Sequence, residues 1–230
     1  MSDLHVLRVF TDPGGSHGNL LAVFLDGAAI PVTDRQSTAA AISFSETVFV
    51  EDRERAAVRI FTPTVELTFA GHPLVGTAWL LAREGVPADH LLPPAGAVPA
   101  RTAPDGAWIA GRPEWAPPFE WAQLGSPTEV EALTSAPEGH DLIGAYAWED
   151  ERTVRARVFP ARLGIVEDEA TGAAAVRLGA LLGRDVTIHQ GRGSVIEVRP
   201  RDDGLVEIGG RVVLEGLRPY PSSFGASPAG

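Results

Sequence analysis

Two segments of the chain repeat the same order of features, and this internal repeat constrains the fold more than any other property. In each copy a β-prone stretch ends in Phe and Pro, and an ionisable residue then stands four positions before a Gly at the start of a small-residue helix. The ionisable residue is His72 before Gly76 in the first copy and Asp168 before Gly172 in the second. Two halves of this kind predict a pseudo-symmetric molecule with a site between them.

Short β-prone runs outnumber helical ones along the chain, which predicts an α+β fold. We expect two lobes, each a curved, mostly antiparallel sheet around a central helix, with these helices at Pro73–Arg83 and Ala170–Leu182. The stretch 87–118 is rich in Pro and Gly and is expected to contain the crossing between lobes. The predicted units are an N-terminal lobe (1–112), a shortened C-terminal lobe (113–218) and a flexible tail (219–230), and we expect the two lobes to exchange a strand.

Composition excludes several function classes. The chain has no cysteine, which removes disulfides and every thiol mechanism, and no lysine, which removes Schiff-base chemistry. A net charge of −11 argues against nucleic-acid binding. No apolar run is long enough for a membrane-spanning helix, and the histidines lack metal-ligand spacing. We therefore expect a cytoplasmic protein without a metal, a membrane or a nucleic-acid partner.

The two helix starts predict a binding site for a small carboxylate. A helix N-terminus has unpaired N–H groups and partial positive charge, so it favours anions. His72 is expected at one N-cap, followed by Pro73 at the first helical position, and Asp168 is expected at the other N-cap. Gly76 and Gly172 lack side chains, so a backbone or a ligand can approach them closely. If the helices face each other, His72 and Asp168 flank the bound anion.

Each residue also has an ordinary interpretation when it is considered singly. Asp168 is then a simple helix cap, His72 a structural histidine, and Glu46 a polar residue at the start of a strand. The recurrence of an ionisable group at the same place in both halves favours the functional interpretation, because simple caps need not recur in register.

Four segments of the chain resemble the phenazine-biosynthesis isomerase-like (PhzF-like) family, whose fold is shared with diaminopimelate epimerase. The resemblance is carried by Val9-Phe10-Thr11 with Gly18-Asn19, by Phe44-Ser45-Glu46-Thr47, by Phe69-Ala70-Gly71-His72-Pro73 with Gly76-Thr77-Ala78, and by Glu167-Asp168-Glu169-Ala170-Thr171-Gly172. The final segments Gln190-Gly191 and Val206-Glu207-Ile208-Gly209-Gly210 also fit. The resemblance implies two lobes with the active site in the cleft between them, a homodimer, and no cofactor.

The resemblance also assigns roles to individual residues. It implies that Glu46 is the base that transfers a proton and that His72 and Asp168 line the site with it. The residues it implies for substrate binding, through side chains or backbone N–H groups, are Ser45, Asn19, Gly71, Gly172 and Ala173. Some relatives of the family use a pair of thiols, one on each face of the substrate, to exchange a proton. This mechanism is excluded here, because this chain has no cysteine.

Two functions remain open from the sequence. The first is a cofactor-independent isomerase that shifts a proton on a small carboxylate-bearing metabolite, with Glu46 as acid and base. The second is a catalytically silent binding or regulatory protein on the same scaffold. The second is motivated by Ala173, where the family usually has Ser, and by a short second lobe. The chain also departs from the family at Glu169 and at Leu20, where the family usually has Pro.

Overall fold

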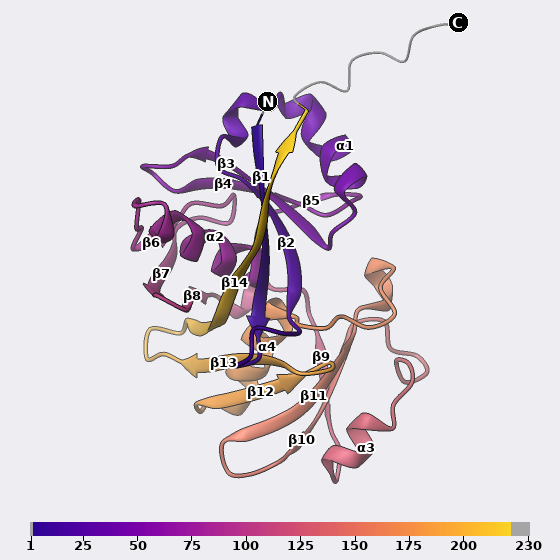
Figure 1. Cartoon of the computed structure of the whole chain (residues 1–230). Helices are drawn as coiled ribbons and strands as arrows, with labels where there is room; N and C mark the ends of the chain where they lie inside the picture. The colour runs from indigo at the N-terminus through magenta and orange to yellow at the C-terminus, as the bar shows by residue number, and fades with distance from the viewer. Residues whose placement is uncertain (1, 222–230) are drawn as a thin grey trace, which may run out of the picture.

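The computed structural model describes residues 2–221 and shows two lobes stacked end to end (Figure 1). The first lobe contains β1 (Ser2–Thr11), β2 (Asn19–Phe24), α1 (Val32–Ile42), β3 (Glu46–Asp52), β4 (Ala57–Phe61), β5 (Glu66–Leu67), α2 (Gly71–Arg83), β6 (His90–Leu91), β7 (Val98–Ala103) and β8 (Gly106–Gly111). The second contains β9 (Glu120–Gln123), α3 (Pro127–Glu131), β10 (Ile143–Trp148), β11 (Thr153–Phe159), α4 (Gly172–Leu182), β12 (Val186–Gln190), β13 (Ser194–Pro200) and the start of β14 (Val206–Tyr220). This confirms the predicted α+β class.

Helix α2 is the core of the first lobe. Every residue from Gly71 to Leu81 is buried, because this helix is apolar or small on all its faces and the sheet curves around it. Gly76 was expected to leave room for a ligand or another backbone, and that expectation is wrong. A Cβ at Gly76 would lie 2.6 Å from a Leu21 side-chain carbon and 2.8 Å from one of Val9, so this glycine lets α2 pack closely on β1 and β2.

Helix α4 plays the same part in the second lobe. Its buried residues are Gly172, Ala174, Ala175, Val176, Leu178 and Gly179. A Cβ at Gly179 would lie 2.5 Å from a Val198 side-chain carbon and 2.6 Å from one of Val206, which shows how closely α4 approaches β13 and β14. Small residues therefore set the distance between helix and sheet in this lobe, as the sequence pattern indicated.

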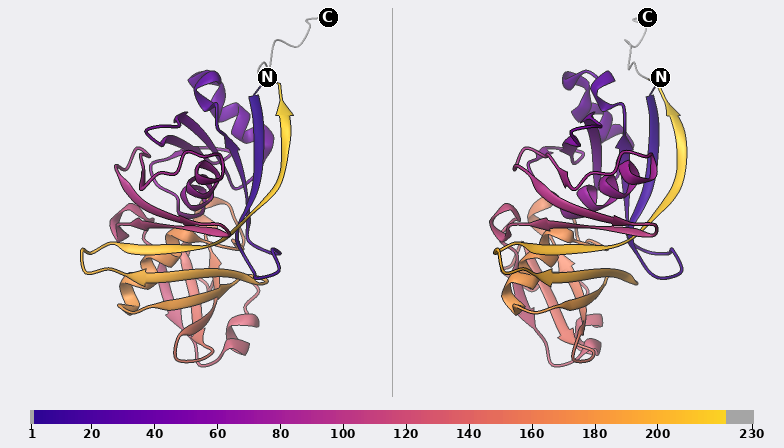
Figure 2. Two further views of the ribbon diagram at one scale, coloured as in Figure 1. Left: turned by 60° about the vertical axis from the view of Figure 1, so that its left-hand side comes forward. Right: turned by 90° about the vertical axis from the view of Figure 1, so that its left-hand side faces the viewer.

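Strand β14 joins the two lobes. Its first residues pair with β13 and β8, and residues from Arg211 to Tyr220 pair with β1. Figure 2 shows the same strand in yellow, running from the second lobe up along the side of the first. The strand order β5-β4-β3-β2-β1-β14-β13-β12-β11-β10-β9 is therefore continuous through both lobes.

The pseudo-symmetry is present, but its register differs from the one the sequence suggested. In the first lobe Ile60 pairs with Leu67, four residues before α2 begins at Gly71. In the second lobe Val158 pairs with Asp168, four residues before α4 begins at Gly172. Gly71 therefore corresponds to Gly172, His72 to Ala173 and Leu67 to Asp168. His72 and Asp168 are not equivalent positions, and the site between the lobes is asymmetric.

Several predicted boundaries also change. Residues Pro219 and Tyr220 of the predicted tail pair with β1, while residues 222–230 of that tail lie outside the described residues. The predicted lobe limits, 1–112 and 113–218, stay predictions, since β14 belongs to both lobes. Within residues 2–221, no helix is long and apolar enough to cross a membrane.

Candidate active site between the lobes

Glu46 and His72 form a close pair at the inner end of the first lobe. Glu46 is the first residue of β3, and His72 is the second residue of α2. Their Oε2 and Nε2 atoms are 3.2 Å apart, with only 16% and 5% of the respective side chains exposed. Neither atom has a well-oriented hydrogen-bond partner among the described residues. Two buried polar atoms without such partners are costly unless they serve a function, so this pair is the strongest mark of a site.

The surroundings of Glu46 favour its protonated form. Burial raises the pKa of the Glu46 carboxyl most, and the nearby Asp168 carboxylate raises it further. His72 and a hydrogen bond from Ser45 act in the opposite direction, and the net pKa shift is upward from 4.5. A raised pKa makes the ionised carboxyl group a stronger proton acceptor, which suits a group that must accept and then return a proton.

Asp168 is held by hydrogen bonds on both of its carboxylate oxygens. Asn19 donates its amide to Oδ1 at 2.7 Å, and the Thr171 hydroxyl donates to Oδ2 at 2.7 Å. Asn19 begins β2 in the first lobe, so its bond to Asp168 crosses from one lobe to the other. Asn19 also donates to the carbonyl of Ala170 at 3.0 Å. The Asp168 carboxylate is therefore fixed in orientation close to Glu46.

Asp168 does not cap a helix, which corrects the sequence prediction. The N-cap of α4 is Thr171, and the N-cap of α2 is Ala70 rather than His72. Gln190 supports this arrangement by donating to the Asp168 carbonyl and to the Thr171 hydroxyl, both at 2.9 Å. Thr171 and Gln190 belong to the motifs that carry the family resemblance, but the sequence analysis gave neither of them a role.

The N-termini of α2 and α4 meet face to face through their first residues. A Cβ built on Gly71 would lie 2.8 Å from the Cα of Gly172, and one on Gly172 would lie 2.9 Å from the His72 nitrogen. Neither helix has a side-chain hydrogen bond at its N-cap. The positive ends of two helices thus converge without a capping acid, an arrangement that favours a bound anion.

Ser45 and Ala173, the other two predicted binding residues, have different surroundings. The Ser45 hydroxyl lies 3.5 Å from the Leu20 carbonyl, and its hydrogen bond to Glu46 lowers the pKa of that carboxyl. Ala173 is half-buried and packs against the small cluster around Phe119. Across residues 2–221, no group of three or more His, Asp or Glu side chains could hold a metal ion.

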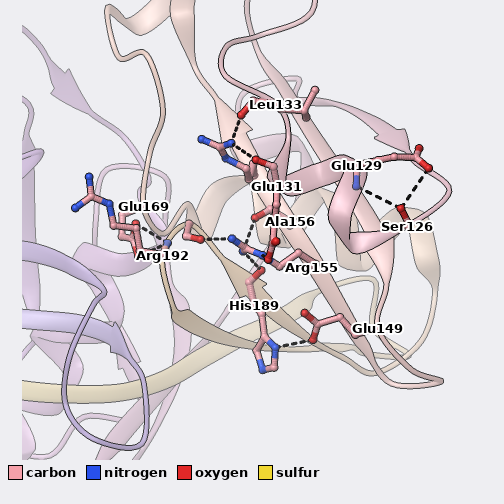
Figure 3. Close-up of polar contacts among 12 residues, drawn as sticks. Ser126, Glu129, Glu131, Leu133, Glu149, Arg155, Ala156, Glu169, His189 and Arg192 are labelled. Carbon is pink, nitrogen blue, oxygen red and sulfur yellow. Dashed lines mark hydrogen bonds and ion pairs between the residues drawn. The ribbon is translucent and has the colours of Figure 1, made fainter.

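A second network, which the sequence did not predict, adjoins Asp168. The Glu169 carboxylate accepts hydrogen bonds from the Arg192 backbone nitrogen at 2.9 Å and from the Ser194 hydroxyl at 2.8 Å. Ser194 in turn accepts from the backbone nitrogen of Gly18 at 2.9 Å, which lies in the first lobe next to Asn19. Figure 3 shows the link between Glu169 and Arg192. Glu169 therefore ties the two lobes together beside the candidate site.

Comparison with known proteins assigns the chain to a family. The model of a family described as Phenazine biosynthesis-like protein matches residues 7–140, which is more than half of the chain. The chain belongs to this family. A curated relative, the trans-2,3-dihydro-3-hydroxyanthranilate isomerase of Pseudomonas fluorescens, is 32% identical over 218 residues, covering 76% of this chain and 78% of the relative.

Solved structures of the phenazine biosynthesis-like family extend the comparison to nearly the whole chain. A phenazine biosynthesis protein of the PhzF family from Enterococcus faecalis superposes with a TM-score of 0.79 at 22% identity, covering 94% of this chain and 98% of that one. A predicted epimerase from Pseudomonas aeruginosa superposes with a TM-score of 0.75 at 26% identity, covering 97% and 100%. The curated relative is named as an isomerase, and the second lobe of this chain has the family's architecture.

Proposed function

We propose that this family member is a cofactor-independent isomerase that moves a proton between two carbons of a small carboxylate-bearing metabolite. The observation that carries the proposal is the buried Glu46–His72 pair, whose facing atoms lack well-oriented hydrogen-bond partners. The pair lies next to the convergent N-termini of α2 and α4. The same inter-lobe region thus offers a proton-transferring group and a place for the substrate's carboxylate.

In the proposed reaction the Glu46 carboxylate takes a proton from a carbon of the substrate. The electron pair of the broken C–H bond moves into a π system of the substrate that is conjugated with its carboxylate. The first-turn N–H groups of Gly71, His72 and Gly172 stabilise the negative charge that develops on this carboxylate. The protonated Glu46 then delivers the same proton to a different carbon. Substrate and product have the same composition, so no cofactor or co-reactant is needed.

The asymmetry of the two lobes supports a reaction with one base. Glu46 opens β3, which pairs in parallel with β2, and the corresponding strand β10 opens with Ile143. The position equivalent to His72 is Ala173. The second lobe therefore has no matching acid–base pair, which favours return of the proton on the same face over exchange through two opposed bases.

The alternative is a silent binding protein on the same scaffold. The fully occupied oxygens of Asp168 and the apolar Ala173 are the observations in its favour. Both candidate functions include the binding of a carboxylate, but only an isomerase exchanges a carbon-bound hydrogen of its ligand with solvent.

The test follows C–H exchange in deuterated water by mass spectrometry, across a panel of small aromatic and amino carboxylates. We expect deuterium uptake into at least one bound acid, and we expect Glu46→Gln to reduce its rate by roughly 10²–10⁴-fold, the usual contribution of general acid–base catalysis. Glu54→Gln is the matched control, because Glu54 is exposed and remote from this pair. Full exchange by Glu46→Gln rules out its role, and binding without exchange supports the silent protein.

A further inference from the structure

Gln190, the last residue of β12, is buried, and its side-chain amide reaches the segment that carries Asp168. Its Nε2 atom lies 2.9 Å from the main-chain carbonyl oxygen of Asp168 and 2.9 Å from the hydroxyl oxygen of Thr171. A carbonyl oxygen can only accept a hydrogen bond, so the atom that faces it is the amide nitrogen and not the amide oxygen. Both N–H groups of this amide are therefore used, one on the carbonyl and the other on the hydroxyl.

The bond from Gln190 fixes the direction of the Thr171 hydroxyl. Because the hydroxyl oxygen accepts from Gln190, its own hydrogen is left to donate, and the Oδ2 atom of Asp168 lies 2.7 Å away. A carboxylate oxygen accepts, so the two bonds run in one direction, from Gln190 through Thr171 to Asp168. Hydrogen bonds that follow one another in this way polarise and strengthen each other.

Thr171 is the N-cap of α4, but its side chain does not cap the helix. A threonine at this position usually accepts a hydrogen bond from a backbone N–H of the first turn, which stabilises the helix by about 1 kcal/mol. Here the hydroxyl donates to Asp168 instead. The first turn of α4 is left without a side-chain cap, and the hydroxyl serves to orient the Asp168 carboxylate.

The main chain of Asp168 is held between two neighbouring strands. Its N–H donates to the Val158 carbonyl of β11 at 3.0 Å, and its carbonyl accepts from Gln190 at the end of β12. The turn after Gln190 packs closely on the next residue, since a Cβ at Gly191 would lie 2.6 Å from the Glu169 carbonyl oxygen. Gln190 therefore helps to fix Asp168 through its main chain as well as through its carboxylate.

The position of Asp168 matters because its charge acts on Glu46. The Asp168 carboxylate raises the pKa of the buried Glu46 carboxyl, while His72 on α2 lowers that pKa. Among residues 2–221, these two are the titratable groups whose charges act on Glu46. The interaction between two charges depends on their distance, and it is stronger where burial excludes water. An Asp168 carboxylate that rotates or withdraws therefore raises the pKa of Glu46 less.

We propose that Gln190 is a positioning residue for the reaction, which acts through the Thr171 hydroxyl to hold the Asp168 carboxylate in place beside Glu46. The hydrogen bonds of its amide nitrogen go to Asp168 and Thr171, so its effect on Glu46 is indirect. This inference rests on the proposed function, because it takes Glu46 as the base. The link from Gln190 to the protonation of Glu46 can nevertheless be tested without a substrate.

The test follows the protonation of Glu46 by NMR, in the full chain labelled with carbon-13 at the side-chain carboxyl of glutamate. The signal of Glu46 is the one that disappears in Glu46→Gln, and its chemical shift is recorded across a pH titration. Gln190→Met keeps the length of the side chain and removes the amide. Thr171→Val removes the hydroxyl that Gln190 orients, while Thr171→Ser keeps it.

Two further variants bracket the result. Gln123→Met is the matched control, because it makes the same chemical change at an exposed glutamine of the edge strand β9. Asp168→Asn gives the limit, since it removes the charge that Gln190 is proposed to hold in place. Urea unfolding shows that each variant is folded before it is titrated. His72 is unchanged in every variant, so its charge is common to all the titrations.

We expect Gln190→Met to lower the apparent pKa of Glu46 by at least about 0.5 pH unit, the result of weakening one buried charge interaction. Thr171→Val should lower it in the same way, and Asp168→Asn should lower it at least as much. Thr171→Ser and Gln123→Met are expected to keep the wild-type value. Adding Gln190→Met to Asp168→Asn should cause no further change, because a positioning residue has no effect once the group that it positions has lost its charge.

An unchanged or raised pKa of Glu46 in Gln190→Met overturns the inference, and so does an equal change in the Asp168→Asn background. The titration needs no substrate, so a chain that exchanges no carbon-bound hydrogen can still show the effect of Gln190, and either idea can fail alone. Where exchange is observed, its rate should fall at a lower pH in Gln190→Met than in the wild type, because the base stays ionised to a lower pH.

Discussion

The meeting of α2 and α4 makes Gly71→Ala the most informative substitution at the site. The new Cβ would lie 2.8 Å from the Gly172 Cα and 2.8 Å from the terminal carbon of Ile208. Ordinary contacts begin at 3.4 Å, so the two helix ends must separate by about 0.6 Å, the difference of these distances. One of the colliding atoms belongs to the backbone and cannot rotate away. Overpacking of this kind costs about 1–3 kcal/mol.

We therefore expect Gly71→Ala to lower the free energy of unfolding by that amount in urea titrations, and Tm by roughly 2–4 °C per kcal/mol for a chain of this size. The deuterium exchange rate should also fall, because the first-turn N–H groups no longer converge on the carboxylate. Gly216→Ala is the matched control. A Cβ there meets nothing within 4 Å, and removing a strand glycine is expected to be neutral or to stabilise by about 0.5 kcal/mol. If Gly71→Ala is as stable and as active as Gly216→Ala, the close approach of the helices is refuted.

Three further predictions concern charge and assembly. Burial raises the pKa of Glu46 above 4.5, so the stability that this group contributes is present below pH 4.5 and is lost as pH rises through the raised pKa. Glu46→Gln should therefore gain in free energy of unfolding relative to the wild type between pH 4 and pH 8, and a constant difference across that range contradicts the burial argument. Glu169→Gln should lose about 1–3 kcal/mol in urea unfolding, because the Arg192 nitrogen and the Ser194 hydroxyl lose a charged acceptor. Glu54→Gln is the control, and an equal stability of the two variants would show that the Glu169 network contributes nothing. We also expect a homodimer, and a monomeric mass by sedimentation in dilute solution would exclude it.

Local patterns in the sequence predicted the main elements of the fold. The apolar and small residues of α2 and α4 define both central helices, which the sequence predicted at Pro73–Arg83 and Ala170–Leu182. The short strands β5, β6 and β9 were not predicted, because strands of two to four residues carry too little periodicity. The sequence left open whether the two helix N-termini face each other, and the structure shows that they do.

The structure brings the three residues predicted as catalytic close together, but in an arrangement that the sequence repeat did not predict. Glu46, His72 and Asp168 do come together, as the family resemblance implied. The equivalence of His72 with Asp168 was wrong by five residues, because His72 corresponds to Ala173. An alignment of the two repeats from the sequence alone pairs the most similar residues. The structure instead pairs the first residues of α2 and α4, and the two alignments differ.

The sequence by itself determined which chemistry is possible. The absence of cysteine and lysine excludes thiol and Schiff-base mechanisms, and the apolar patterns determine which segments become the buried helices. The tertiary structure alone decided how these parts meet: β14 crosses between the lobes, and Asn19 holds Asp168 across 149 positions of the chain. The physical reason is that local propensity depends on near neighbours in the chain, while the partners of a polar side chain depend on which distant segments pack together.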